Sequence, residues 1–209
     1  MIIYLIRHGQ TEWNQNFRYQ GSQDEELNSK GLEQANNIAE ILKSCTIGKI
    51  YSSPLKRALK TSEPLAKKLN INVDIINEFK EINLGKWEGK TWDEIKIEYK
   101  EFLETWSKDI AGIAPPEGES YLELKERVFN ALYSLLPNNN SNIVMVSHGA
   151  VIKVILCTIL QMPLQNRAAL DIPNGSISVI EYVEDKNSFR VLAVNSNYNF
   201  TENYGCTTS

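Results

Sequence analysis

The sequence predicts an α/β fold of three layers, with helices on both faces of a mostly parallel central sheet. Short apolar runs at residues 1–6 and 142–147 are typical of strands that are covered on both faces. Segments with helical periodicity alternate with such runs along the chain, and this alternation indicates parallel strands joined by helices. The chain has 209 residues and shows no repeat or linker, so we expect one domain over 1–209.

The first half of the chain supplies two helices and a second strand. Ser29 is placed to cap a helix whose apolar residues fall on one face. A short strand is expected at 49–52, and a helical pattern follows from Pro54, because proline suits the first turn of a helix. Pro64 should kink or restart this second helix, with Ser62 available as a new cap.

The second half of the chain adds further helices and a hairpin. Between two expected helices lies the stretch SKDIAGIAPPEGES, whose glycine and proline content is typical of a mobile flap. The C-terminal FTENYGCTTS carries no readable role and is expected to fray. Residues 71–76 form a β-branched run. The remaining predictions are helices near 92–106, 121–136 and 151–160, and a late hairpin of 177–183 with 189–194.

Charge and hydropathy exclude two classes of partner. The formal net charge is -4, so no basic field is available for nucleic acid or an anionic membrane. No window approaches the ~18 uninterrupted apolar residues that a membrane helix needs. A phosphate site in this protein must therefore use a few local cations.

The cysteines and the N-terminus favour a cytoplasmic location. Cys45, Cys157 and Cys206 form no close pair and no CxxC motif, which argues against a disulfide framework and against a zinc site. The N-terminus has no basic region followed by an apolar stretch, so no secretory signal is expected.

The two histidines of the chain occupy similar places. His8 ends the pattern strand–Arg–His–Gly, and His148 ends the pattern strand–Ser–His–Gly. Ligands of parallel α/β sheets bind at the carboxyl ends of the strands. The two imidazoles would face one pocket if their strands were neighbours, which the sequence alone does not show.

Arginines accompany these histidines. Arg7 precedes His8, and Arg57 lies in a helix whose start faces the same edge of the sheet. Guanidinium groups bind phosphate oxygens in bidentate fashion. Two arginines, two histidines and a helix N-terminus predict a site for a dianion.

A carboxylic acid is available beside this site. Glu78 and Glu81 lie three residues apart and would share a face if that segment were helical. An anion bound nearby favours the protonated form of a carboxyl, which could then donate a proton near neutral pH. Spacing alone does not choose between the two residues.

Six motifs in a fixed order give the chain a family resemblance that reaches from residue 2 to about 182. The motifs are LIRHGQTEWN, YQGSQDEELNSKGLEQA, YSSPLKRALKTSEPLA, EINLGKWEG, PEGES and VSHGAVI. Together they closely resemble the histidine phosphatase superfamily, which includes cofactor-dependent phosphoglycerate mutases and metabolite phosphatases. The resemblance implies a phosphoglycerate mutase-like fold, with a helical cap at about 87–119.

The resemblance also implies a role for each matched residue. His8 would be the nucleophile that accepts the phosphoryl group, and Glu81, rather than Glu78, would donate a proton to the leaving group. Arg7, Arg57 and His148 would bind and neutralise the phosphoryl group. No metal or other cofactor is implied. The matched substrate- and phosphate-binding residues are Asn14, Gln20, Gly21 and Gly149.

Departures from the mutase pattern favour a phosphatase. Glu81 is followed by INLGKWEG, whereas the mutases carry polar groups after their acid, in a pattern resembling ERHYGALQG. The long basic insertion of the mutases is absent from this sequence. EINLGKWEG with PEGES looks most like the branch that hydrolyses α-ribazole 5′-phosphate. Phosphoserine phosphatases carry a histidine where Leu84 stands. Four alternatives stay open: a mutase, a phosphatase for phosphoserine or fructose 2,6-bisphosphate, a broad-specificity phosphatase, and a non-catalytic phosphometabolite-binding protein.

Specificity is expected to reside in the cap. Its aromatic side chains would either stack on a ring of the substrate or pack the cap against the sheet. The expected partner is a small phosphorylated metabolite, without nucleic acid or membrane, and a homodimer rests on analogy alone. The cap aromatics are Trp92, Tyr99, Phe102 and Trp106.

Overall fold

One sheet of six strands carries the part of the fold described by the computed structural model, residues 1–139 and 141–196. The strand order is β3-β2-β4-β1-β5-β6. The first four of these strands are mutually parallel, and β5 and β6 complete the sheet in antiparallel pairing, so the predicted mostly parallel sheet is confirmed. The strands are β1 (Ile2–Arg7), β2 (Ile47–Ser52), β3 (Val73–Ile75), β4 (Asn142–Ser147), β5 (Ile177–Val183) and β6 (Ser188–Ser196).

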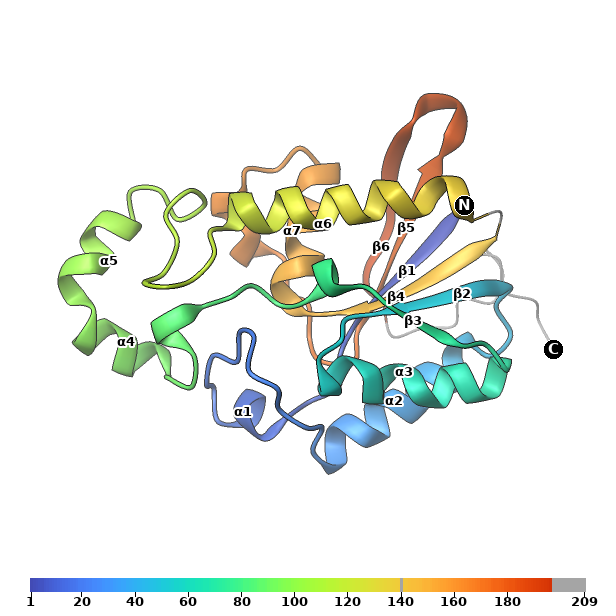
Figure 1. The fold of residues 1–209 in the computed structure, drawn as a ribbon, viewed down its shortest axis with the longest axis horizontal. Coiled ribbons are helices and arrows are strands. Elements are labelled where there is room, and N and C mark those ends of the chain that lie inside the picture. The colour runs from blue at the N-terminus through green and yellow to red at the C-terminus, as the bar shows by residue number, and fades with distance from the viewer. Residues whose placement is uncertain (140, 197–209) are drawn as a thin grey trace.

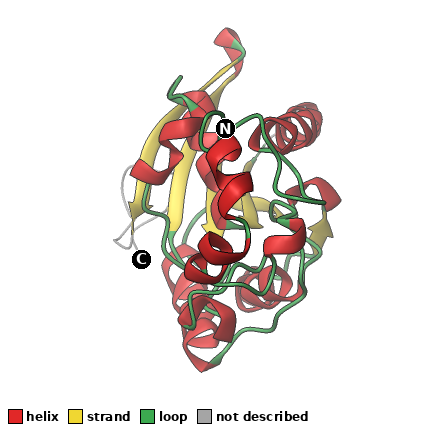
Figure 2. Cartoon of the chain, turned by 90° about the vertical axis from the view of Figure 1, so that its left-hand side faces the viewer, coloured by secondary structure: helices red, strands yellow, loops and turns green. Residues whose placement is uncertain are grey.

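Helices cover both faces of this sheet (Figures 1 and 2). Helices α2 (Ser29–Leu42) and α3 (Lys56–Leu69) lie on one face, and α6 (Tyr121–Leu135) and α7 (Gly149–Ile159) lie on the other. The predicted three-layer α/β/α arrangement is therefore confirmed. The shorter helical segments are α1 (Glu12–Gln15), α4 (Trp92–Glu98), α5 (Lys100–Trp106), η1 (Asn77–Phe79), η2 (Gly85–Trp87), η3 (Leu136–Asn138), η4 (Leu164–Ala169) and η5 (Glu184–Lys186).

Strand β1 is buried on both of its faces, as its continuous apolar run predicts. Ile3 and Leu5 pack in the core beneath α6 and α7, whereas Tyr4 and Ile6 pack in the core beneath α2 and α3. Successive side chains of a strand point to opposite faces, so one apolar hexapeptide joins both halves of the core. The end of β1 is thereby held rigidly at the carboxyl edge of the sheet.

Two predictions about the first helices are wrong in detail. Asn28, not Ser29, caps α2, and its side chain accepts a hydrogen bond from the Gly31 amide at 2.9 Å. Pro64 lies inside α3 and does not restart it, whereas the expected kink stays a prediction. A proline removes one helical hydrogen bond, but α3 keeps a buried face against α2 and the sheet that holds it together. Ser62 bonds back to the Leu59 carbonyl at 2.7 Å instead of capping a new helix.

The expected helix at 92–106 is divided at Tyr99 into α4 and α5, which extend from the sheet at the left of Figure 1. A buried tryptophan, Trp87, lies at the centre of the aromatic side chains of this region. Its ring centroid is 5.1 Å from that of Trp106 and 6.3 Å from that of Trp92. Tyr99 and Phe102 also contact it, so packing explains most of these rings.

Residues 107–120, the expected flap, are hydrogen-bonded to the loop that precedes α4. The Lys86 amide donates to the Pro116 carbonyl at 2.9 Å, and the Glu119 amide donates to the Asn83 carbonyl at 2.7 Å. Gly85 has a φ of 52°, and a Cβ at this position would lie 2.2 Å from the Pro116 oxygen. A glycine is therefore required where the two loops meet. Mobility of this segment stays a prediction.

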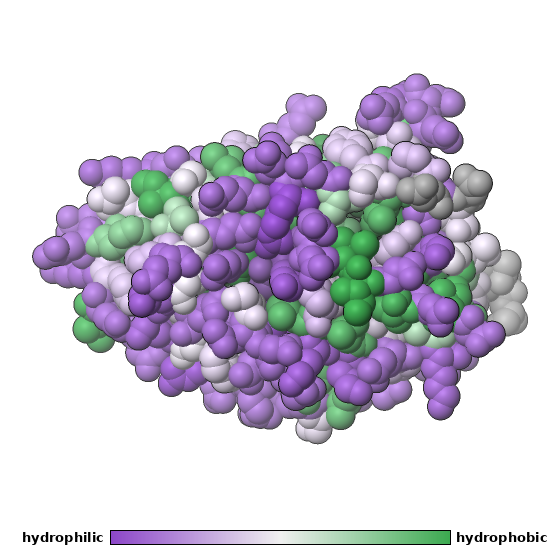
Figure 3. All heavy atoms as spheres, in the orientation of Figure 1, coloured by the Kyte–Doolittle hydropathy of each residue, from purple (hydrophilic) through white to green (hydrophobic). Residues whose placement is uncertain are grey.

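The cysteines agree with their predicted state only in part, and Cys206 lies outside the described residues. Cys45 is disulfide-bonded, whereas Cys157 is free and buried. The cysteine argument for a reducing compartment therefore loses its support. None of the helices in the described residues is long and apolar enough to cross a membrane, and the face seen in Figure 3 is mainly hydrophilic. The stretch FTENYGCTTS lies outside the described residues.

Candidate active site

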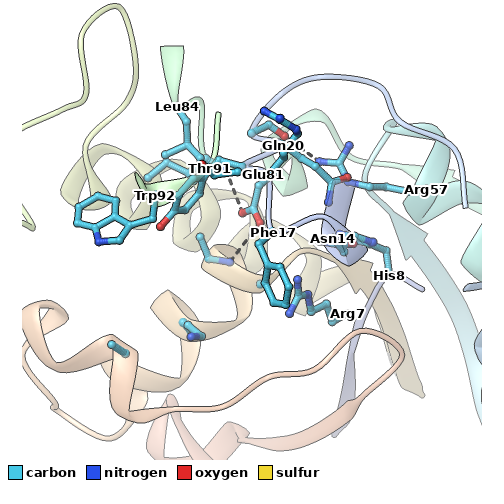
Figure 4. A pocket seen from close by; sticks show the side chains of 18 of the residues that line it. Arg7, His8, Asn14, Phe17, Gln20, Arg57, Glu81, Leu84, Thr91 and Trp92 are labelled. Carbon is cyan, nitrogen blue, oxygen red and sulfur yellow. Dashed lines mark hydrogen bonds between the residues drawn. The ribbon is translucent and has the colours of Figure 1, made fainter. Parts of the chain in front are cut away.

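The two histidines meet because their strands are neighbours. In the parallel pairing of β1 with β4, Arg7 is the register partner of Ser147, so the next residue of each strand is a histidine at the carboxyl edge. The imidazole centroids of His8 and His148 are 5.1 Å apart. A pocket of about 770 Å³ opens at this edge (Figure 4). Its lining includes the predicted residues Arg7, His8, Asn14, Gln20, Gly21, Arg57, Glu81 and Gly149.

The ring of His8 presents one free nitrogen. Its Nδ1 lies 2.7 Å from the Gly9 carbonyl oxygen, which only accepts, so we assign the hydrogen to Nδ1. Nε2 then keeps its lone pair and has no hydrogen-bond partner among the described residues. Burial, followed by the charges of Arg57 and Arg7, holds the pKa of His8 well below its ordinary value of 6.5. The imidazole is consequently neutral at pH 7.

His148 is fully buried beside His8 and is absent from the pocket lining. Its Nε2 lies 2.8 Å from the Ser53 hydroxyl, and its Nδ1 is buried without a partner among the described residues. Burial, followed by the charge of Arg57, lowers the pKa of His148 well below 6.5. Both histidines are therefore neutral rings in a positively charged surrounding.

The two predicted arginines are fixed by carbonyl groups rather than by carboxylates. Arg7 Nη1 donates to the Ile172 carbonyl at 2.6 Å, and Arg57 donates to the carbonyls of Gln23 and Gly21 at 2.5 and 2.7 Å. Neither arginine forms an ion pair with any described residue, and the Nε of each is buried without a partner there. Burial lowers the pKa of Arg57 to about 10, which leaves it charged at pH 7. Their charges and unused donors suit an anion.

Asn14 is oriented by a network that sequence reasoning missed. Its Oδ1 lies 3.2 Å from the Thr11 amide and accepts from Asn174 Nδ2 at 3.0 Å, so its own amide hydrogens face elsewhere. Asn174 also donates to the carbonyl of His8 at 3.1 Å and lies 3.4 Å from that of Gly9. Asn174 therefore ties the loop after β1 to the turn before β5. The only signal in the sequence was the turn pattern PNG.

The structure separates the two candidate acids. Glu81 lines the pocket, where Oε1 accepts from the Ile82 amide at 3.0 Å and Oε2 accepts from the Ala150 amide at 3.3 Å. The second contact ties the carboxylate to the first turn of α7. Glu78 is exposed and does not line the pocket, and its carbonyl accepts from Arg127. Arg127 also donates to the Glu81 carbonyl at 3.1 Å, so it positions this segment.

The three remaining predicted residues shape the pocket wall. Gln20 is buried, and its Oε1 has no partner among the described residues. Gly21 has a φ of 54° and supplies the carbonyl that holds Arg57. A Cβ on Gly149 would lie 3.4 Å from Arg7 Nε, so the missing side chain leaves room beside the guanidinium.

Glu88 organises the same wall and was also missed, because its role depends on contacts between distant loops. Its Oε1 accepts from the Ser22 amide at 2.7 Å and from the Leu84 amide at 3.2 Å. Its Oε2 accepts from Gln23 Nε2 at 2.8 Å. One carboxylate thus joins the loop at 20–23 to the turn that follows Glu81.

The chemistry of this centre depends on imidazole, guanidinium and carboxyl groups. The described part of the chain holds no cluster of three or more His, Cys, Asp or Glu side chains suited to a metal ion. A neutral imidazole nitrogen, surrounded by cationic donors and a carboxyl, can accept a phosphoryl group.

A family comparison decides the class of protein. The model of the histidine phosphatase superfamily (branch 1) matches residues 3–196. The chain belongs to this superfamily. The family resemblance drawn from the six motifs is confirmed, together with the phosphoglycerate mutase-like fold and the enzyme class that it implied.

Individual histidine phosphatases similar to this chain carry several names. A probable phosphoglycerate mutase GpmB from Escherichia fergusonii is 34% identical over 189 residues, which cover 88% of this chain and 86% of that protein. The structure of a putative α-ribazole-5′-P phosphatase from Escherichia coli has a TM-score of 0.87 and 27% identity, over 97% of this chain and 99% of that one. A phosphoserine phosphatase from Entamoeba histolytica, in complex with 3-phosphoglyceric acid, has a TM-score of 0.82 and 35% identity, over 93% and 96%.

Proposed function

We propose that this histidine phosphatase hydrolyses phosphate monoesters of a small metabolite through a phosphohistidine at Nε2 of His8. The observation that carries this proposal is the free Nε2 of a neutral His8, among the unused donors of Arg7 and Arg57. A phosphate dianion would supply the acceptors that these donors lack. Because the site is buried, its charges act at low dielectric and stabilise the transferring group strongly.

The first step transfers the phosphoryl group to the protein. The Nε2 lone pair of His8 forms a bond to phosphorus while the bond to the ester oxygen breaks. Glu81, as the carboxylic acid, gives its proton to the departing oxygen, so the product leaves as an alcohol. Arg7, Arg57 and the Asn14 amide hold the equatorial oxygens. His148 adds an Nδ1–H donor if the Ser53 hydroxyl donates to its Nε2.

The second step returns the protein to its starting state. Glu81, now a carboxylate, takes a proton from water as the water oxygen bonds to phosphorus. The phosphorus–nitrogen bond breaks, its electron pair returns to Nε2 of His8, and inorganic phosphate leaves. No step needs a metal ion or an organic cofactor.

Among substrates, α-ribazole 5′-phosphate is the candidate that we prefer. It is supported by the motifs around Glu81, by the likeness to the α-ribazole-5′-P phosphatase structure, and by a pocket much larger than phosphate. Segment 87–119 would act as a cap that selects the alcohol. The relatives called probable phosphoglycerate mutases support a mutase as the second candidate, and the Entamoeba protein supports phosphoserine.

Two measurements test the proposal. A panel of α-ribazole 5′-phosphate, phosphoserine, fructose bisphosphates and 3-phosphoglycerate, with and without 2,3-bisphosphoglycerate, should release inorganic phosphate in the presence of EDTA. A dominant mutase signal would contradict the phosphatase assignment. Labelled substrate quenched without acid should leave an acid-labile, base-stable phosphoenzyme. His8→Ala should abolish this label and lower turnover by about 10⁴-fold or more while the protein stays folded.

The cytoplasmic location and the homodimer remain proposals. Cell fractionation and sedimentation would test them, and the disulfide of Cys45 counts against a reducing compartment.

A further inference from the structure

Phe17 combines two unfavourable features at the mouth of the active-site pocket. Its backbone has a φ of 54°, in the left-handed region that a bulky residue adopts only with strain. Its side chain is 85% exposed, so the ring gains almost no packing from the fold. The residue lines the pocket, and Figure 4 shows its ring directed into that space. A strained backbone at a side chain that adds no packing to the fold indicates a functional role for that side chain.

Hydrogen bonds on both sides impose this backbone conformation. The Phe17 amide donates to the Asn14 carbonyl at 3.2 Å, and the Arg18 amide donates to the Trp13 carbonyl at 2.8 Å. Arg18 Nη1 then reaches the Gly89 carbonyl at 2.6 Å and Glu94 at 2.9 Å. These bonds need only the backbone of residue 17, so a glycine would satisfy them without strain. The phenyl ring is therefore the part of Phe17 that the fold does not use.

Two further aromatic side chains lie in the wall of this pocket. Trp92 and Tyr19 line the same pocket, and their ring centroids are 6.5 Å apart. Trp92 is supported from behind by Trp87 and Trp106, at 6.3 and 6.2 Å. Arg7, Asn14 and Arg57 line this pocket together with Phe17, so the alcohol of an ester held by these donors would lie among the side chains of the pocket wall.

We infer that Phe17 is a specificity-determining residue whose ring contacts the alcohol portion of the phosphate ester. The favoured substrate class is a phosphate monoester whose alcohol carries a flat apolar ring. This inference rests on the proposed phosphatase function and deepens it. Ring contacts of this kind contribute modestly each, so the effect is a preference of several-fold rather than an absolute requirement.

Two alkyl phosphates that differ by one ring test the inference: 2-phenylethyl phosphate and ethyl phosphate, whose leaving alcohols are similar in acidity. Phe17→Gly should lower kcat/KM for 2-phenylethyl phosphate by about 5–10-fold and change that for ethyl phosphate by less than about twofold. Relief of strain should leave the Tm unchanged or raise it by up to ~4 °C. Phe17→Tyr, which keeps the ring, should retain the preference.

Gln161→Gly is the matched control, because Gln161 is exposed, has a φ of 54° and lies outside the active-site pocket. It should change the Tm in the same direction as Phe17→Gly and leave the preference between the two esters intact. The inference is overturned if Phe17→Gly lowers kcat/KM equally for both esters, or lowers it for neither. It is also overturned if the Tm falls, because the ring would then be a packing element.

A binding measurement separates failure of this inference from failure of the proposed function. If the wild-type protein hydrolyses neither these esters nor any member of the metabolite panel, the phosphatase assignment fails, and calorimetric Kd values for the two esters test Phe17 independently. The wild type should bind 2-phenylethyl phosphate several-fold more tightly than ethyl phosphate, and Phe17→Gly should remove the difference. Equal Kd ratios in the two proteins would overturn the inference.

Discussion

The floor and the rim of the pocket are built in opposite ways. The floor consists of side chains at the carboxyl edge of the sheet. Its key side chains, His8 at the end of β1 and Arg57 in α3, are at most 2% exposed, as is His148, which is buried beside His8. The rim consists of loops and short helices, where Phe17 is 85% and Trp92 38% exposed. Sheet register fixes the floor, whereas hydrogen bonds between loops and surface ion pairs fix the rim. The contrast suggests that the floor determines the reaction and the rim determines the substrate.

The two regions should therefore respond to substitution on different scales. Charges and hydrogen-bond donors on the floor act at low dielectric, where each electrostatic interaction is much stronger than in water. The ion pairs of the rim are exposed and screened by salt. Substitutions on the floor should change kcat by orders of magnitude, and those on the rim should change selectivity by small factors.

After the loss of the nucleophile itself, the largest effect is expected for Glu81→Gln, which removes the transferable proton and keeps the shape of the side chain. Turnover of alkyl phosphates should fall by about 10²–10⁴-fold. The loss should be smaller for p-nitrophenyl phosphate, because p-nitrophenolate leaves without protonation. Steady-state kinetics on both esters measures the difference.

Glu78→Gln is the control for this variant, because Glu78 lies three residues away, is exposed and does not line the pocket. It should retain wild-type turnover. The role of Glu81 as proton donor would be refuted if Glu78→Gln lost as much turnover as Glu81→Gln. It would also be refuted if Glu81→Gln lost equal turnover on the alkyl phosphate and on p-nitrophenyl phosphate.

The second prediction concerns acid pH. Burial and the two arginines lower the pKa of His8, so the neutral nucleophile should persist below pH 6.5. Nuclear magnetic resonance titration of His8 in the free protein should show its transition well below that value. A transition at or above pH 6.5 would contradict the positive field assigned to the floor.

The same shift links acid pH to stability. The unfolded chain, with an ordinary histidine pKa near ~6.5, binds protons more readily than the folded chain. The free energy of unfolding is therefore expected to be fully retained above that pH and to fall as the pH drops below it. Both buried histidines contribute in this direction, because the pKa of His148 is lowered as well. Urea unfolding at several pH values measures this slope.

Much of the floor could be predicted from the sequence because its signals are local. A strand buried on both faces is a continuous apolar run, and the run 1–6 ends directly at Arg7 and His8. That β1 and β4 are neighbours could not be read, because strand pairing is non-local. The choice of Glu81 over Glu78 came from resemblance, since both carboxylates fit the spacing.

The rim and the hydrogen-bond network that supports it were harder to predict from the sequence. Asn174 and Glu88 act through hydrogen bonds to residues more than 60 positions away, which no motif encodes. Pro64 was expected to kink or restart a helix, and the helix does not restart there. The left-handed backbone at Phe17 is imposed by its neighbours, and the letter F gives no hint of it.

Asn174→Ala tests the network between the two regions. It removes a donor shared by the His8 carbonyl and the Asn14 side chain, so the loop after β1 loses one of the hydrogen-bond donors that hold it. We expect a loss of about 1–3 kcal/mol in the free energy of unfolding and a fall of roughly 10-fold in kcat, because two hydrogen bonds of about 0.5–1.5 kcal/mol each are removed. Chemical denaturation and kinetics measure the two effects.

Asn36→Ala provides the comparison for this variant, because the side chain of Asn36 is exposed and, among the residues that the structure describes, bonds only to the Leu32 carbonyl of its own helix. Asn36→Ala should change neither the free energy of unfolding nor kcat appreciably. A loss confined to KM in Asn174→Ala, with kcat unchanged, would place Asn174 in substrate binding instead of positioning.

The smallest effect is expected at the exposed ion pair between Arg18 and Glu94, which are 2.9 Å apart. Glu94→Gln removes the charge and keeps a group that can still accept from the Thr91 amide, the other partner of this side chain. Selectivity between the two alkyl phosphates should change by less than about threefold, and kcat for ethyl phosphate should stay the same. At about 1 M salt the wild type should approach the variant, because salt screens an exposed pair. A large, salt-independent loss of kcat would mean that the rim also sets the chemistry, and the separation between floor and rim would fail.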